Sequence, residues 1–148
     1  MNLEPVESLP LEGVRVLDLS RLLPGPFCTL LLADMGAQVL KIEDTGLGDY
    51  MRWTPPYVGE EELKAAGTAS APYLALNRNK RAIKLDLKAE PAREVLVALV
   101  REHDVLVESF RPGVLDRLGV GYERLREANP GLIYCAITGF GADGPYAD

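Results

Sequence analysis

The 148-residue chain carries 22 acidic and 16 basic residues, and its formal net charge of −6 argues against non-specific nucleic-acid binding, which depends on surplus Lys and Arg. Its hydrophobic fraction of 47% and charged fraction of 26% are those of a globular domain, and no apolar run approaches the ~20 residues of a membrane-spanning helix. Because the acidic start also lacks the basic segment of a signal peptide, we expect one cytoplasmic domain over residues 1–148, with no nucleic-acid or membrane partner.

The first pattern along the chain predicts a strand, a tight turn, a helix and a second strand. The β-rich run at 14–19 is broken at 20–26 by two prolines and a glycine, a helical pattern over 27–35 ends at Gly36, and a strand resumes at 38–43. Two strands joined by one helix form a parallel, right-handed unit. Since ligands of parallel sheets bind at the carboxyl ends of the strands, we expect a ligand near the turn.

The turn at 20–26 has two interpretations. In the structural one, Pro26 occupies the first helical position, where its missing N–H does no harm. In the functional one, a helix N-terminus with Gly25 beside it accepts a phosphate or another anion. The spacing leaves both open, and the chain contains neither the dinucleotide glycine fingerprint nor a P-loop motif.

Residues 45–71 differ from the rest, because they are rich in Gly and Pro. So long a stretch is usually functional or mobile, and we expect an excursion from the sheet with one short helix near 60–66. After it, β-rich runs cover 82–86, 104–108 and 132–137, and helical patterns cover 91–102, 112–118 and 122–128. The alternation predicts a doubly wound α/β fold, namely a mostly parallel sheet with helices on both faces.

Three loops are candidates for a ligand site. Arg78, Lys80 and Arg81 form the densest basic cluster, which is either a solvated loop or a phosphate site. The loop at 108–113 follows a predicted strand and places an arginine beside a helix start. Closely spaced glycines at 138–141 follow the last strand, and such glycines either let the backbone approach a ligand or only make turns.

The sequence shows no catalytic or metal-binding set. Cys28 and Cys135 lie in apolar patterns, which predicts buried side chains without a disulfide, and the absence of spaced His partners argues against a zinc site. His103, the single histidine, ends a helical pattern, where a cation complements the helix dipole. We therefore expect a ligand-binding domain without a metal and without visible catalytic machinery.

Several segments, taken in order, resemble the N-terminal part of class III CoA-transferases, the CaiB/BaiF-type family that also contains α-methylacyl-CoA racemases. They are residues 11–19 with Pro24-Gly25-Pro26, residues 34–43, residues 76–88, residues 108–119, and residues 129–130 with 137–141 and Gly144-Pro145. The resemblance covers nearly the whole chain from Leu11, and it rests on the order and spacing of these segments.

The resemblance implies that this part of the protein holds coenzyme A (CoA) in a Rossmann-like fold, and that two complete chains interlock as a homodimer. It places the CoA contacts at Leu22, Leu23, Leu85, Asp86, Leu87, Lys88, Ser109, Phe110, Arg111, Arg117, Thr138, Gly139, Phe140 and Gly141. The residue pattern agrees for the strand-end loops and for Arg111, whereas periodicity assigns Leu85 and Leu87 to a buried strand.

The resemblance assigns no catalytic residue to this chain. In the family, a catalytic Asp (transferases) or His (racemases) follows the Gly-Pro turn that corresponds to 144–145, and Asp148 belongs to the approach to that position. We therefore expect the CoA-binding N-terminal portion of an acyl-CoA:carboxylate CoA-transferase, with a CoA thioester and a carboxylic acid as substrates. The alternatives are a portion of an α-methylacyl-CoA racemase and a non-catalytic CoA-binding or assembly subunit.

Overall fold

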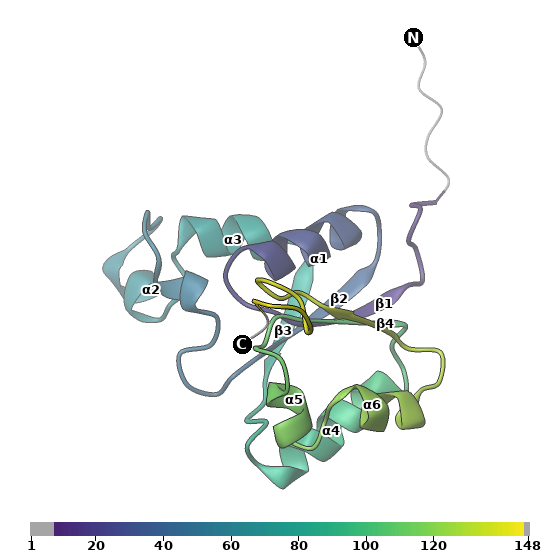
Figure 1. Cartoon of the computed structure of the whole chain (residues 1–148). Helices are drawn as coiled ribbons and strands as arrows, with labels where there is room; N and C mark the ends of the chain where they lie inside the picture. Colours follow the sequence, from purple (N-terminus) through teal and green to yellow (C-terminus); the bar gives the residue numbers. More distant parts are fainter. Residues whose placement is uncertain (1–7, 147–148) are drawn as a thin grey trace.

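The computed structural model describes residues 8–146, which are organised around one five-stranded sheet. All strands run parallel in the order β3-β2-β1-β4-β5 (Figure 1). They are β1 (Arg15–Leu19), β2 (Gln38–Glu43), β3 (Lys80–Lys84), β4 (Val105–Glu108) and β5 (Ile133–Ala136). The strand order reverses between β1 and β4, and the connections that follow these two strands lie on opposite faces. Their carboxyl ends therefore border the crevice in which such sheets bind ligands.

Helices cover both faces of the sheet, as predicted (Figure 1). One face carries α1 (Pro24–Asp34) and α3 (Ala71–Asn77), and the other carries α4 (Glu90–Val100), α5 (Val114–Arg117) and α6 (Tyr122–Ala128). The predicted α/β class is confirmed, and the described sheet is entirely parallel. Among residues 8–146, no helix combines the length and the apolar character needed to cross a membrane.

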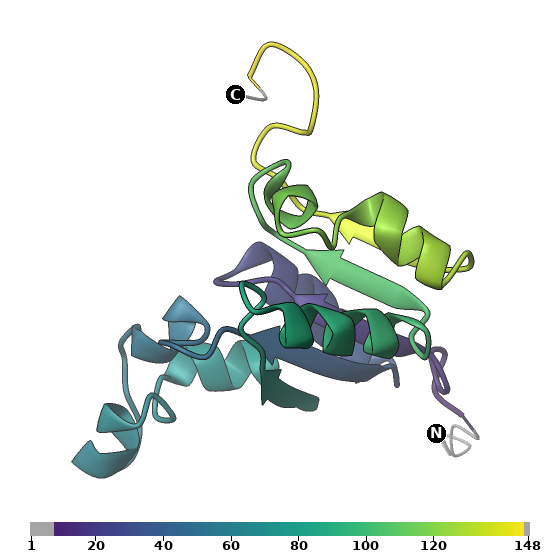
Figure 2. The ribbon, with the colours of Figure 1, turned by 90° about the horizontal axis from the view of Figure 1, so that it is seen from below.

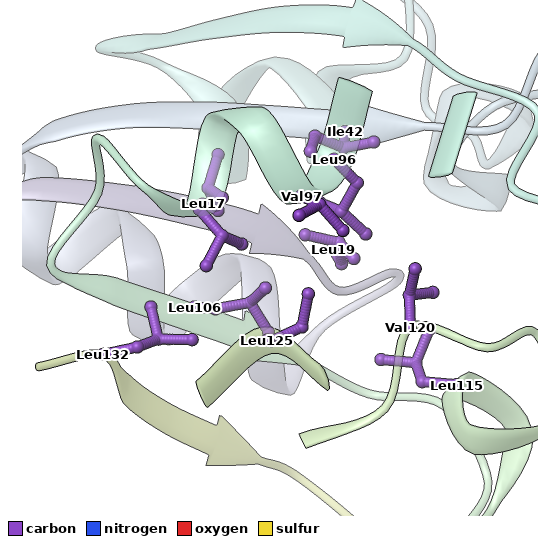
Figure 3. Close-up of a cluster of buried hydrophobic side chains, with 11 residues drawn as sticks. Leu17, Leu19, Ile42, Leu96, Val97, Leu106, Leu115, Val120, Leu125 and Leu132 are labelled. Atoms are coloured by element: carbon purple, nitrogen blue, oxygen red, sulfur yellow. The ribbon is translucent and has the colours of Figure 1, made fainter. Parts of the chain in front are cut away.

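Two apolar cores lie on opposite faces of the sheet. In the larger one, Leu17 of β1 and Leu106 of β4 pack with Leu96 of α4 and Leu125 of α6, all of them fully buried (Figure 3). The smaller core, beside α1, contains Val16, the neighbour of Leu17 in β1. Successive side chains of a strand point to opposite faces, so a central parallel strand is apolar at consecutive positions. This explains why Val16 and Leu17 stand side by side in the β-rich run from which β1 was predicted.

Residues 45–71 leave the sheet after β2, as predicted, and extend away from it (Figure 2). They contain a short 3₁₀ helix, η1 (Tyr50–Trp53), and the helix α2 (Glu61–Ala65). The expected short helix near 60–66 is therefore confirmed. We refer to residues 45–71 as the excursion.

The carboxylate of Glu43, at the end of β2, ties the excursion to the sheet. It accepts hydrogen bonds from Arg52 Nε and Nη2, both at 2.7 Å, and from the Tyr73 hydroxyl and the Asp49 N–H, both at 2.8 Å. Burial raises the pKa of Glu43, but these donors outweigh burial and lower the pKa to about 2. The carboxylate therefore stays charged, and it fixes the start of the excursion beside the end of β2.

Several element boundaries differ from the prediction by one to three residues, and two of them affect the candidate site. α1 begins at Pro24 and not at residue 27, so Pro24 occupies the first helical position that was predicted for Pro26. β3 covers residues 80–84 and not 82–86, because its last residue pairs with the last residue of β2. Leu85 and Leu87 therefore follow the strand, and their assignment to a buried strand is wrong. Both side chains are half-buried against the larger core.

Candidate functional site

A cavity of about 720 Å³ lies at the carboxyl ends of β1 and β4, in the crevice expected to bind a ligand. Six residues that the resemblance assigns to CoA line it: Leu22, Ser109, Phe110, Arg111, Thr138 and Gly139. A second cavity of about 230 Å³ adjoins it and is lined by the predicted residues Leu85, Asp86, Leu87 and Lys88. The structure thus brings loops that are far apart in the sequence to two neighbouring cavities.

Four of the predicted residues line neither cavity. They are Leu23, Arg117, Phe140 and Gly141. Leu23 is 57% exposed directly before α1, and Phe140 is 76% exposed in the loop after β5. A CoA contact at these positions would therefore lie at the rim of the site.

The turn between β1 and α1 forms one wall of the larger cavity, and its backbone is constrained. Both the N–H and the hydroxyl of Ser20 donate to Asp18 Oδ1. Gly25 packs so closely on Ser20 that an added Cβ would lie 2.1 Å from the serine Cβ. Leu22 has a φ of 63°, in the left-handed region, and its N–H donates to Asp49 Oδ1. Strained backbone of this kind persists only where the surrounding structure holds it, and it is common at functional sites.

Two lysines and two aspartates are buried beside this turn. Lys41 Nζ lies 2.9 Å from Asp49 Oδ2 and donates to the Ser20 carbonyl at 2.9 Å. Lys80 Nζ donates to Asp18 Oδ2 at 3.1 Å, and both lysine side chains are 1% exposed. Burial raises the pKa of Asp18, but the two lysines bring it below its ordinary value. The opposite charges balance, which is the condition under which charged groups are buried in proteins.

The burial of Lys80 corrects both interpretations of the basic cluster at residues 78–81. Its ammonium group donates at 2.8 Å to the Pro26 carbonyl and to Thr29 Oγ1, so it fastens α1 to the sheet. Burial lowers the pKa of this lysine. Arg78 is exposed and pairs with a carboxylate at the end of α1. The cluster is therefore not a solvated loop throughout, and Lys80 is not free to bind a phosphate.

The loop after β4 is fixed by Glu108, whose Oε2 accepts the N–H of Phe110 at 2.6 Å. Burial raises the pKa of this carboxyl. Ser109 Oγ accepts the N–H of Arg21 at 3.1 Å, which joins the loop to the turn after β1. As a result, Arg111 is exposed beside the larger cavity, where its guanidinium is accessible to an anion.

Arg21 is a site residue that sequence reasoning missed. Its side chain lines both cavities, and its guanidinium lies 3.2 Å from Asp44 Oδ2. The rings of Tyr50 and Phe110 lie 5.6 and 5.7 Å from its central carbon. The signal in the sequence is slight, because Arg21 is a single cation in a turn that was interpreted through its prolines and glycine.

The remaining reactive side chains have structural roles or lie outside the described part of the chain. Within residues 8–146, no group of three or more His, Cys, Asp or Glu side chains is arranged to hold a metal ion. Cys28 and Cys135 are unpaired and half-buried, and burial raises the pKa of the Cys28 thiol. The ring of His103 contacts the carbonyl of Leu99 at 2.6 Å, near the end of α4. Asp148 lies outside the described residues.

Comparison with known proteins finds relatives of this chain both by sequence and by structure. The profile of CoA-transferase family III matches residues 11–148. The chain is 46% identical over 137 residues to the succinyl-CoA:glutarate CoA-transferase of Homo sapiens, covering 92% of this chain and 30% of that protein. It is also 46% identical over 138 residues to the acetyl-CoA:oxalate CoA-transferase of Acetobacter aceti, covering 93% of this chain and 33% of that protein.

A solved structure agrees with the sequence relatives. A CAIB/BAIF family protein from Brucella suis superposes with a TM-score of 0.85 and 45% identity. The match covers 95% of this chain and 36% of that chain. The chain thus spans about a third of the length of the proteins that it matches.

Proposed function

This chain belongs to CoA-transferase family III, and we propose that it forms the CoA-binding part of an enzyme that moves CoA from an acyl-CoA thioester to a carboxylic acid. The observation that carries this proposal is the pair of adjoining cavities at the carboxyl ends of the strands. A CoA thioester has a nucleotide end and a long pantetheine arm, so it requires an extended site with separate places for charge and for apolar contact.

The lining of the two cavities fits these requirements. Arg111 in the larger cavity and Lys88 in the smaller one are exposed cations that can pair with phosphate groups. Leu22 and Phe110 offer apolar surface for the pantetheine arm. The glycine at 139 leaves the backbone open, because an added Cβ there would have no atom within 4 Å. A ligand can therefore approach the backbone of this loop closely.

We propose no metal requirement and no catalytic residue among residues 8–146. By the resemblance, a carboxylate outside them attacks the thioester carbonyl, forms a mixed anhydride and releases the CoA thiolate. The thiolate then attacks the enzyme's own carbonyl in this anhydride, which releases the first carboxylate and leaves an enzyme–CoA thioester. The second carboxylate attacks that thioester and expels the thiolate, which finally takes the new acyl group from the resulting anhydride and restores the enzyme carboxylate. The role of this chain is to hold CoA through both halves of the exchange.

A transferase is favoured over the two alternatives. The relatives described above carry transferase names, which argues against a racemase. Those relatives are enzymes that continue well beyond the matched segment, which argues against a separate assembly subunit. We also propose, on the basis of the family resemblance, that the complete protein is an interlocked homodimer. We propose the cytoplasm as its location, as expected from the sequence pattern.

The test is an isotope experiment on the protein that contains this chain. The protein is mixed with acyl-CoA thioesters of short dicarboxylic acids and with the labelled free acids. We expect label in the thioester, with no exchange of the α-proton in deuterated water. Proton exchange at the α-carbon without transfer of label would contradict the proposal and favour a racemase. Light scattering then gives the mass of the assembly.

A further inference from the structure

Arg21 stands between the two cavities of the proposed CoA site. The cavities share the lining residues Leu19, Arg21, Phe110 and Val114. Arg21 is the one charged residue of this shared wall, and its side chain is 30% exposed. A ligand that extends from one cavity to the other would therefore contact its guanidinium.

The backbone around Arg21 is held on both sides, so only its side chain is free to respond to a ligand. Its own N–H donates to Ser109 Oγ at 3.1 Å. The next N–H, of Leu22, donates to the buried carboxylate of Asp49 at 3.0 Å. These bonds connect the turn to the loop after β4 and to the excursion. The guanidinium is therefore presented from a fixed base.

The guanidinium itself is held weakly. Its carboxylate partner within residues 8–146 is Asp44, whose side chain is 35% exposed. Ion pairs that are exposed to this degree contribute little, because water and salt screen them. The aromatic rings of Tyr50 and Phe110 lie near the cation at 5.6 and 5.7 Å, and they can remain its neighbours when the anion changes.

Asp44 does not depend on Arg21 for its hydrogen bonds. Its Oδ1 accepts the N–H of Gly46 at 2.8 Å and the N–H of Gly48 at 3.3 Å. If the guanidinium turned away, this carboxylate would remain paired with the backbone and partly in water. The cost of separating the two side chains is therefore small.

We infer that Arg21 is a specificity-determining residue that exchanges Asp44 for a phosphate group of the CoA substrate. A guanidinium pairs with phosphate in a planar, two-pronged arrangement that a single carboxylate contact at 3.2 Å does not use. The exchange would select ligands that carry phosphate and would open the wall between the two cavities. This inference rests on the proposed function.

The test compares CoA with pantetheine, which has the same thiol arm and no phosphate, by calorimetric titration of the protein. We expect Arg21→Gln to weaken CoA binding roughly tenfold or more, the loss that follows from removing a charge-assisted hydrogen bond, and to leave pantetheine binding unchanged. We expect Asp44→Asn to strengthen CoA binding about two- to fivefold, because it removes the competing anion. Arg21→Lys keeps the positive charge but lacks the two-pronged guanidinium, so its affinity for CoA should lie between those of the unchanged protein and Arg21→Gln.

Arg81→Gln is the matched control, since Arg81 is exposed on β3 and lines neither cavity. It should leave the affinities for both ligands unchanged, and thermal melting should show every variant folded. Equal losses of CoA and pantetheine binding in Arg21→Gln would show a structural role and overturn the inference, as would no loss of either. If the unchanged protein bound pantetheine and CoA with equal affinity, the inferred recognition of phosphate by Arg21 would be wrong, whereas the proposed CoA site would still hold. If it bound neither, the proposed function would fail as well.

Discussion

The N–H of Leu22 donates a 3.0 Å hydrogen bond to Asp49 Oδ1, across 27 residues of chain. The same carboxylate oxygen accepts the N–H of Met51 at 3.0 Å, and its other oxygen lies 2.9 Å from Lys41 Nζ. Asp49 thus joins the turn after β1, the excursion and β2 at one buried point. Since Leu22 has a φ of 63°, the conformation of this wall of the cavity depends on that point.

Replacing Asp49 should therefore be among the most destabilising single changes in the chain. Asp49→Ala leaves the ammonium of Lys41 buried without its closest carboxylate and leaves the N–H of Leu22 without an acceptor. We expect the free energy of unfolding, measured in urea, to fall by about 3–5 kcal/mol, the range found when one partner of a buried ion pair is removed.

The matched control is Glu123→Ala, which breaks an ion pair to Arg126 in which both side chains are more than half exposed. This change should alter the free energy of unfolding by less than about 1 kcal/mol. A loss below about 1 kcal/mol for Asp49→Ala as well would show that the turn does not depend on the buried pair.

The low pKa of Glu43 predicts a specific loss of stability in acid. Its pKa is lowered from the ordinary value of 4.5 to about 2. The folded state therefore favours the charged carboxylate. The contribution of this ionised carboxylate to the free energy of unfolding is complete above pH 4.5, and it is lost as the pH falls from about 4.5 to about 2. It amounts to roughly 3 kcal/mol, since one pKa unit corresponds to ~1.4 kcal/mol.

The measurement is urea unfolding at a series of pH values, for the protein and for Glu43→Gln. The difference in unfolding free energy between the two should be constant near neutral pH and should shrink below pH 4.5. Glu60→Gln, at an exposed position in the excursion, should follow the unchanged protein at every pH. A difference that does not depend on pH in acid would contradict the assignment to Glu43.

Most of the fold could be predicted because apolar patterns report burial directly. Val16 and Leu17 are buried on opposite faces of β1, and the sequence displays this as two adjacent apolar residues in a β-rich run. The predicted end of β3 was wrong, because the alternation of apolar and polar residues continues beyond the last residue that pairs with β2. Ile83, Leu85 and Leu87 alternate like a strand, but β2 has already ended at the position paired with residue 84. Sequence periodicity contains no information about where a neighbouring strand ends.

The loops that line the candidate site could be predicted from the sequence, but the buried ion pairs and the helix that hold these loops in place could not. Lys41 and Lys80 are charged residues in strands, a pattern that normally indicates exposure, yet both are buried with aspartates: Lys41 with Asp49 of the excursion, and Lys80 with Asp18 of β1. α3 was not predicted, because its apolar stretch is short and follows the glycine-rich excursion, although Ser70 at its N-cap and Pro72 in its first turn are helix-start signals. Arg21 acquires its role only when the loops after β1 and β4 meet. These contacts between distant segments have no local signature.

Gly25 should tolerate no side chain. An added Cβ would lie 2.1 Å from the Cβ of Ser20 and 2.2 Å from its hydroxyl, distances that force the turn to move. We expect Gly25→Ala to lower the free energy of unfolding by about 1–3 kcal/mol, as overpacking does, and to weaken CoA binding through the displaced turn. Gly131→Ala is the control, because its Cβ would meet only one ordinary contact at 3.5 Å. Unchanged stability and binding in Gly25→Ala would show that the turn can shift freely.

Arg111 and Arg117 provide a test of the individual CoA contacts, because the resemblance assigns both to the ligand while the structure separates them. Arg111 lines the larger cavity, whereas Arg117, at the end of α5, lines neither cavity. We expect Arg111→Ala to weaken CoA binding roughly tenfold, with a smaller loss at high salt, since the contact is an ion pair to phosphate. Arg117→Ala should have a smaller effect, because its exposed side chain lines neither cavity. Calorimetric titrations at two salt concentrations provide the comparison, and a larger loss for Arg117→Ala would move the phosphate site from the larger cavity towards α5.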